Sequence, residues 1–194
     1  MTNIVPEFRS PVERSYSTVP DAALRLADNS EAAKVIVRAA PGSKARANLA
    51  QSFAGSRMSG SVLIAGTRPD EWLLIGPADD VTNWMDSLPT EGHVSVVDWT
   101  HGRAMFRLSG ERAPVVLEKV CGLDWSDSMM PNGAVASGSV AKVTCDLIRH
   151  DLKGVASYLL ICDRSFGQYL FDALIDAGNE FGIGVLESGA VDNA

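Results

Sequence analysis

The side chains that could do chemistry are few and lie far apart in the sequence. His93, His101 and His150 do not fall at helical spacing with a glutamate, so the zinc-protease pattern is absent. His101, in a Thr-His-Gly turn, is the best candidate base, although an ordinary turn histidine is the commoner case. The run from Arg149 to Asp151 is more typical of a strand-end loop than of an acid–base pair. These patterns identify no catalytic residue.

Glycines and cysteines give no stronger signal. Gly182-Ile183-Gly184 lacks the helix that follows a dinucleotide-binding loop, and neither a Gly-Lys-Ser/Thr nor a Gly-x-Ser-x-Gly motif occurs. Cys121, Cys145 and Cys162 are widely spaced among apolar neighbours, which indicates small core residues rather than metal ligands or a disulfide framework. We therefore predict no cofactor and no metal in this chain.

Composition narrows the class of protein. The chain has 194 residues, of which 46% are hydrophobic and 21% charged, so one globular domain with a substantial core is expected. A net charge of -7 would repel phosphate backbones, which excludes nucleic-acid binding. The first residues lack the pattern of a secretory signal, and no apolar run approaches the roughly 18 residues of a membrane span. We expect a cytoplasmic protein that does not bind membranes.

A series of strands and helices occurs twice, roughly seventy residues apart. In each series a strand leads through a polar turn into a helix, and a pair of strands and a second helix follow. The first series is predicted at 35–38, 44–54, 61–66, 71–77 and 79–88, and the second at 103–108, 111–121, 139–145, 155–162 and 166–177. The pattern predicts an α+β fold of duplicated strand-helix-strand-strand-helix units, with mixed, mostly antiparallel sheets and helices packed on them.

The domain organisation follows from this repeat. We predict an extended arm at 1–20, one globular domain at 21–185 and a flexible tail at 186–194. The domain is expected to divide into halves at about 21–92 and 93–185. Prolines and sparse apolar residues suggest that the arm becomes ordered only against a partner chain. Asp21 is expected to cap a short helix that runs through Leu26.

Large apolar side chains provide the candidate interface. Trp72 and Trp84 fit the core of the first half, whereas Trp99 and Trp125 suit a core or an interface equally well. Loops rarely expose large apolar side chains without covering them. The residues predicted to contact a partner are Phe8, Trp99, Trp125, Met129 and Met130.

Several short motifs, taken in order, resemble the gamma-subunit family of heterotetrameric sarcosine oxidase. They are Arg9-Ser10-Pro11, Asp98-Trp99-Thr100 before the strand at 103–108, Val120-Cys121-Gly122-Leu123-Asp124, Ala141-Lys142-Val143-Thr144 and the run from Tyr158 to Phe166. The resemblance covers most of the chain. Because that family is related to the folate-binding aminomethyltransferase of the glycine cleavage system, it implies an aminomethyltransferase-like fold.

The resemblance also implies a function. It makes this chain a non-flavin, non-catalytic subunit that supports assembly with the alpha, beta and delta subunits of a sarcosine oxidase. Such a complex demethylates sarcosine to glycine with oxygen, giving hydrogen peroxide and 5,10-methylenetetrahydrofolate. Its FAD, FMN and NAD reside in other subunits, and tetrahydrofolate accepts the one-carbon unit. The alternatives are an autonomous folate-dependent aminomethyltransferase and a free-standing regulatory or assembly domain.

Overall fold

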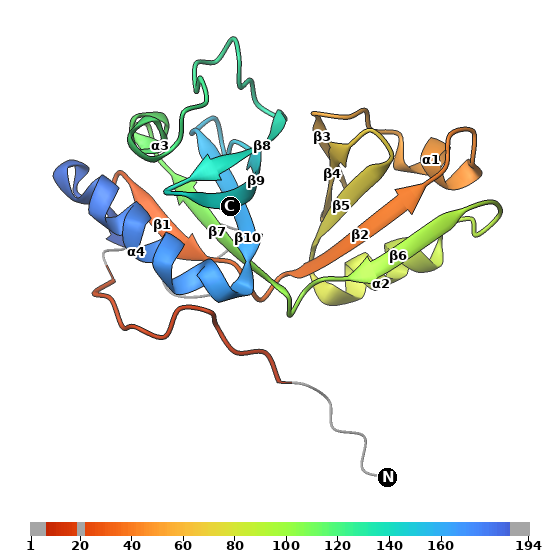
Figure 1. The fold of residues 1–194 in the computed structure, drawn as a ribbon, viewed down its shortest axis with the longest axis horizontal. Helices are drawn as coiled ribbons and strands as arrows, with labels where there is room; N and C mark the ends of the chain where they lie inside the picture. Colours follow the sequence, from red (N-terminus) through yellow and green to blue (C-terminus); the bar gives the residue numbers. More distant parts are fainter. Residues whose placement is uncertain (1–6, 19–21, 187–194) are drawn as a thin grey trace.

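Two β-sheets packed face to face, with helices on their outer sides, make up the fold (Figure 1). The structure, a computed structural model, describes residues 7–18 and 22–186. Each sheet is built mainly from one of the two series of strands and helices, so the predicted α+β duplication is confirmed.

The first unit follows the order strand, helix, three strands, helix and strand. Its elements are β2 (Ala33–Ala39), α1 (Lys44–Leu49), β3 (Ser56–Ser59), β4 (Val62–Arg68), β5 (Glu71–Gly76), α2 (Ala78–Asp86) and β6 (Val94–Asp98). The second unit repeats this order and ends in a two-residue strand. Its elements are β7 (Arg103–Ser109), α3 (Ala113–Val120), β8 (Val135–Val140), β9 (Val143–Arg149), β10 (Ser157–Asp163), α4 (Gly167–Gly178) and β11 (Gly184–Val185), with short 3-10 turns on either side of α4.

The strand orders show that the two units share one topology. The first sheet has the order β3-β4-β5-β2-β6 and the second β8-β9-β10-β7-β1-β11, where β1 is Arg25–Asp28. All neighbouring pairs are antiparallel except β1 with β11. In the first sheet β2 lies between β5 and the edge strand β6, as in the ferredoxin-like arrangement. In the second sheet β7 likewise lies between β10 and β1, and β11 follows β1 at the edge.

The pairing of β6 and β1 differs from the predicted division into halves. β6 pairs with β2 and belongs to the first sheet, although the boundary at 92/93 assigned it to the second half. β1 lies in the first half of the sequence, yet it pairs with β7 in the second sheet. The position next to the first strand of each unit is thus filled by β6 in one sheet and by β1 in the other.

Three apolar clusters form the core. One lies between the first sheet and helices α1 and α2, and another between the second sheet and helices α3 and α4. The third joins the inner faces of the two sheets through residues such as Ile36, Leu73 and Leu159. Because both faces of the central strands are covered, β4, β5 and β10 are almost continuously apolar in sequence.

Two local predictions were wrong. The chain through Leu26 is the strand β1 rather than a helix, because it pairs with β7 along its length, and the proposed cap Asp21 lies outside the described residues. The strand predicted at 139–145 is a hairpin of β8 and β9, which turns at Ala141 and Lys142. Both turn residues have positive φ, 46° and 70°, as a two-residue hairpin turn of this hand requires.

The described part of the N-terminal arm packs on its own chain, which contradicts the prediction that it needs a partner to become ordered. The ring of Tyr16 lies 5.1 Å from that of Phe171 in α4. The Gln168 side-chain oxygen accepts hydrogen bonds from the backbone N–H groups of Glu13 (2.8 Å) and Arg14 (3.1 Å). These contacts cover one side of α4, so the arm is part of the folded unit.

Candidate functional site

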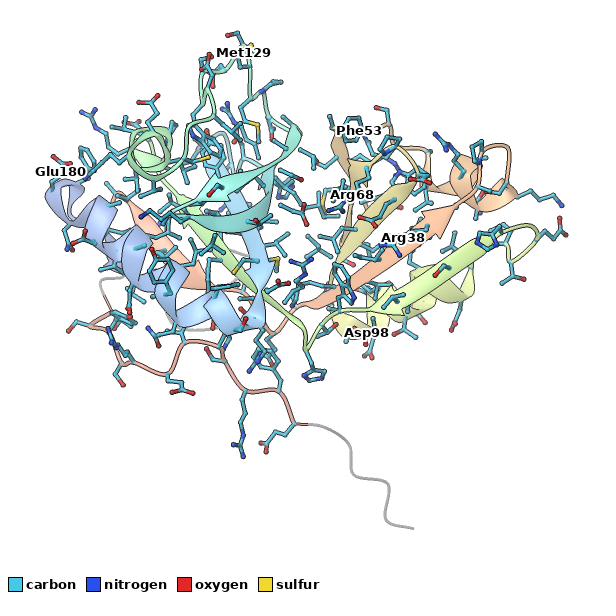
Figure 2. All side chains as sticks on the ribbon, in the orientation of Figure 1. Arg38, Phe53, Arg68, Asp98, Met129 and Glu180 are labelled. Atoms are coloured by element: carbon cyan, nitrogen blue, oxygen red, sulfur yellow. The ribbon has the colours of Figure 1, made fainter. Side chains whose placement is uncertain are left out.

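Exposed apolar side chains mark the surfaces that could contact a partner. Among the described residues, the large ones are Phe53, Met58, Val96, Val97, Met129, Val155, Phe166 and Tyr169. Figure 2 shows Phe53 and Met129 at the same end of the molecule, where the loops of the two units project, and Asp98 toward the opposite end. Val96 and Val97 adjoin Asp98 in β6. Phe53 and Met129 therefore lie apart from Val96 and Val97, so these four residues do not form one continuous patch.

Met129 and Met130 have different environments although they are neighbours in the loop between α3 and β8. The Met129 side chain is 66% exposed and projects at the tip of the loop (Figure 2), whereas Met130 is 4% exposed. Met130 packs in the cluster beneath α3 and α4. Met129 therefore stays a candidate contact residue, and the prediction for Met130 is wrong because its own chain covers it.

Trp125 is also buried, so the structure decides its role in favour of the core. Its side chain is 2% exposed, and its ring meets that of Tyr158 edge-on, with 5.3 Å between centroids and 88° between planes. The loop that carries Trp125 folds back over the second sheet and uses this ring as an apolar anchor. The prediction that Trp125 contacts a partner is accordingly corrected.

Arg149 fixes that loop to the sheet. Its guanidinium binds the carboxylate of Asp151 at 3.0 and 3.1 Å and that of Asp127 at 2.5 Å, and it donates to the Met130 carbonyl at 2.7 Å. The hydrogen bond to Asp151 is the main reason that the pKa of Arg149 is raised. With its donors engaged in this way, the Arg149–Asp151 pair holds the loop and is not poised for proton transfer.

Trp99 and Phe8 lie partly exposed where the two units meet. The Arg103 guanidinium stacks 4.3 Å from the Trp99 ring, and the Phe8 ring lies 6.1 Å from that of His101. The Arg164 guanidinium covers the Phe8 ring at 5.4 Å. We call Phe8, Trp99 and His101, together with Val96 and Val97 of the adjoining β6, the junction surface. His101 is an exposed residue of the turn between β6 and β7, as the sequence suggested.

Lys34 lies buried beneath this surface. Its side chain is fully buried, and Nζ donates to the carbonyls of Ser30 at 2.7 Å and Ala32 at 2.6 Å. Burial lowers the pKa of Lys34 to about 8, although the nearby carboxylates of Asp28 and Asp98 oppose this effect. Sequence reasoning missed Lys34 because the predicted strand began at residue 35, whereas β2 begins at Ala33 and places Lys34 on the same face as Ile36.

Glu71 is a second buried charge, on the inner face of the first sheet. Its carboxylate is 2% exposed and accepts hydrogen bonds from Arg38 Nε (2.8 Å), from Thr67 (3.0 Å) and from Arg68. Burial alone would raise the pKa of Glu71, but the donors outweigh it and lower the pKa. Figure 2 shows Arg38 and Arg68 near each other on the first sheet, with Arg68 at the end of β4. Sequence reasoning missed this cluster because its members come from three strands.

The cysteines and His150 are the other side chains that could react. All three cysteines are buried, which confirms that they are core residues. His150 is half-buried, and burial together with the charge of Arg107 lowers its pKa. Within residues 7–18 and 22–186, no group of three or more His, Cys, Asp or Glu side chains could hold a metal ion. In the same residues no helix is long and apolar enough to cross a membrane.

Comparisons with known proteins give a consistent relationship. A family model for the GCVT N-terminal domain matches residues 54–194. Sarcosine oxidase subunit gamma from Corynebacterium sp. (strain P-1) is 30% identical over 190 residues, which cover 89% of this chain and 91% of the relative. The subunit of the same name from Arthrobacter sp is 28% identical over 193 residues, with the same coverage.

Solved structures agree on the fold. A chain of the heterotetrameric sarcosine oxidase from Corynebacterium sp. U-96, in complex with pyrrole 2-carboxylate, has a TM-score of 0.72 at 23% identity, covering 84% of this chain and 88% of that one. The glycine cleavage system aminomethyltransferase T from Bartonella henselae has a TM-score of 0.63 at 15% identity, covering 86% of this chain and 48% of that one. The structural likenesses show a shared fold, and the 30% identical relative and the family model show that the chain belongs to the family of sarcosine oxidase gamma subunits and carries a GCVT N-terminal domain.

Proposed function

We propose that this chain is the gamma subunit of a heterotetrameric sarcosine oxidase and that it supports assembly rather than catalysis. The observation that carries the proposal is the 30% identity to a gamma subunit over nearly the full length of both chains. The proposed partners are the alpha, beta and delta subunits. The arrangement of polar groups supports a structural role, since Lys34, Glu71 and Arg149 are each held by groups of the chain itself.

The proposed reaction belongs to the complex as a whole. As an oxidoreductase that acts on CH–NH donors with oxygen, it converts sarcosine, oxygen and tetrahydrofolate into glycine, hydrogen peroxide and 5,10-methylenetetrahydrofolate. FAD, FMN and NAD supply the redox chemistry from other chains. We assign no step of this reaction to a residue of the gamma chain.

Gly110, Gly182 and Gly184 do not form a loop that would bind a dinucleotide phosphate. A Cβ at Gly110, before α3, would lie 2.3 Å from the Ala23 carbonyl oxygen, so this glycine allows the backbone segment before β1 to pack closely against it. Gly182 has a φ of 68° and ends the 3-10 turn after α4, while Gly184 lies in β11. Phosphate loops instead direct backbone N–H groups of a glycine-rich turn at the ligand. These glycines are therefore explained by a close backbone contact, a turn and a strand, and not by a phosphate ligand.

The surfaces proposed for docking are Met129 at the loop end and Phe8 and Trp99 on the junction surface. Met129 is 66% exposed and Phe8 and Trp99 are partly exposed, and partly exposed aromatic residues are frequent anchors of interfaces. We expect Trp99→Ala to weaken assembly, with a cost in binding of about 2 kcal/mol. Met58→Ala, which also removes a large exposed side chain, is the matched control, since Met58 lies in β3 at the edge of the first sheet opposite β6.

Copurification tests the proposal. The chain is co-expressed with alpha, beta and delta subunits, one of which carries the affinity tag, and the stoichiometry of the purified complex is measured. We expect this chain at one copy per complex, and we expect the chain purified alone to be colourless and unable to oxidise sarcosine. Flavin retained stoichiometrically by the isolated chain would contradict the proposal. Binding of tetrahydrofolate and aminomethyl transfer by the isolated chain would favour the transferase instead.

A further inference from the structure

The strand β6 has an outer edge that no described strand covers. It is the last strand of the first sheet and pairs only with β2, in a register that places Val96 opposite Val37 and Val97 opposite Ile36. Figure 1 shows β6 at the rim of that sheet. Unpaired strand edges readily accept a further strand, and proteins usually protect them with lysine, proline or a bulge. β6 contains neither residue, and its pairing with β2 is regular.

The backbone groups on this free edge can be assigned from the neighbouring hydrogen bonds. The N–H of Trp99 donates to the Lys34 carbonyl at 2.8 Å, and the carbonyl of His93 accepts from the Ala40 N–H at 3.1 Å. Because backbone groups of successive residues point to opposite sides of a strand, odd-numbered residues of this segment face β2. The N–H and C=O groups of Val94, Val96 and Asp98 therefore point away from the sheet.

The second sheet shows what covers the equivalent edge. There, β1 takes the position that β6 takes in the first sheet, and the outer edge of β1 is covered by β11 in parallel orientation. The N–H groups of Gly184 and Leu186 donate to the carbonyls of Leu24 and Leu26, each at 2.9 Å. One of two topologically equivalent edges is thus completed by an extended segment, and the other is left open by the described residues.

The side chains on β6 suit burial by such a segment. Val96 is 47% exposed on the face shared with Val37, and Val97 is 39% exposed on the face shared with Ile36. A strand added to the edge would cover parts of both valines at once. The edge also continues directly into Trp99 on the junction surface, which is itself a proposed docking surface.

We propose that the outer edge of β6 pairs with an extended segment of another subunit of the complex, as β11 pairs with β1 within this chain. The inference rests on the proposed function, because it requires a partner chain. Main-chain hydrogen bonds to Val94, Val96 and Asp98 supply the affinity. Apolar side chains of the incoming strand at the positions beside Val96 and Val97 supply the fit.

Val96→Pro tests the strand pairing, and Val96→Thr is its matched control. Proline removes an N–H that points away from β2, so the ladder with β2 is kept and the isolated chain is expected to melt within about 3 °C of wild type. Threonine keeps both the N–H and the branched side chain. We expect Val96→Pro to weaken assembly with the partner subunits at least about tenfold and Val96→Thr to change it less than about threefold. Equal assembly of both variants overturns the proposal.

Hydrogen exchange of the wild-type chain gives a second measurement, which decides the matter even if Val96→Pro does not fold. The amides of Val94 and Val96 are expected to exchange at least about a hundredfold more slowly in the complex than in the isolated chain. Fast exchange in the complex overturns the proposal. So does slow exchange in the isolated chain, which assigns the edge to a segment of the same chain when that chain is monomeric and to a second copy when it is dimeric.

The outcomes separate this inference from the proposed function. If the wild-type chain assembles with its partners and Val96→Pro assembles equally well, only the pairing at β6 fails. If the wild-type chain does not assemble with them, the gamma-subunit function and the pairing fail together.

Discussion

Truncation of Trp125 to alanine should destabilise the isolated chain strongly. The ring is 2% exposed and packs edge-on against Tyr158, so the substitution removes an almost wholly buried aromatic side chain. A buried aromatic residue covers about 150–250 Å², and at about 25 cal/mol per Å² this corresponds to about 4–6 kcal/mol as an upper bound. Measured truncations of buried aromatic residues cost about 3–5 kcal/mol of unfolding free energy. We take the latter range as the expected loss.

The assay is thermal or urea unfolding of the isolated chain. For a protein of this length, each kcal/mol lowers the melting temperature by about 2–4 °C, so Trp125→Ala should lower it by about 6–20 °C. Trp125→Phe keeps an aromatic ring against Tyr158 and should lose less. Phe53→Ala is the matched control, since that ring is 57% exposed and its loss should cost about 0.5 kcal/mol or less.

A different outcome for Trp125→Ala would contradict the core role. If Trp125→Ala leaves the melting temperature within a few degrees of wild type but releases the chain from its partners, Trp125 contributes to docking and the packing described above does not determine its role. If Trp125→Ala lowers the melting temperature and also weakens assembly, Trp125→Phe distinguishes the two roles. Phenylalanine keeps a ring against Tyr158, so a core role predicts that it restores the melting temperature and assembly together.

Three further predictions follow from buried polar groups and from the arm. Lys34 has a pKa of about 8 when folded and 10.5 ordinarily, so the unfolded chain binds more protons between these values and stability rises with pH across that window. Between pH 7.5 and 10.5, the free energy of unfolding of wild type should rise by about 3 kcal/mol relative to that of Lys34→Met, as measured with urea. The same pH dependence of stability in both proteins would contradict this. The pKa of Glu71 is lowered in the folded chain. Its ionised carboxylate therefore stabilises the fold at pH values above the ordinary pKa of 4.5, and this stabilisation is lost as the pH falls below 4.5 towards the lowered pKa. Glu71→Gln should cost about 1–3 kcal/mol at pH 7 and progressively less in acid, and a cost independent of pH would refute the role of the carboxylate charge. Tyr16→Ala removes the ring that packs on Phe171 and should cost the isolated chain about 1–3 kcal/mol, whereas an unchanged melting temperature would show that the arm does not stabilise the fold.

Local patterns in the sequence correctly predicted much of the secondary structure. The apolar run at 71–77 and the turn before it gave the β4–β5 hairpin, and the polar turn at Pro41-Gly42-Ser43 gave the start of α1. Such signals succeed because a turn residue or a helix cap acts on its immediate neighbours. The end of α1 was less accurate: the helix stops at Leu49 rather than at residue 54, since Ala50 adopts a left-handed conformation.

The structure bears on the candidate interface residues only through their exposure. Phe8, Trp99 and Met129 were selected as apolar residues in irregular segments, and each is at least partly exposed. Trp125 and Met130 were selected by the same criterion and are buried. Apolar character alone cannot separate these cases, because the covering surface comes from distant residues such as Tyr158.

The sequence by itself determined the duplicated α+β architecture, the burial of the cysteines and the family resemblance, since these depend on short-range patterns of apolar and polar residues and on their order along the chain. Only the tertiary structure decided that β1 joins the second sheet whereas β6 stays in the first, that the arm lies on α4 and that no described strand covers the outer edge of β6. Strand pairing over such separations is set by which surfaces remain to be covered once the whole chain has folded. The same reason explains Lys34 and Glu71, which are charged residues in sequence and become buried, paired groups only when several strands converge on them.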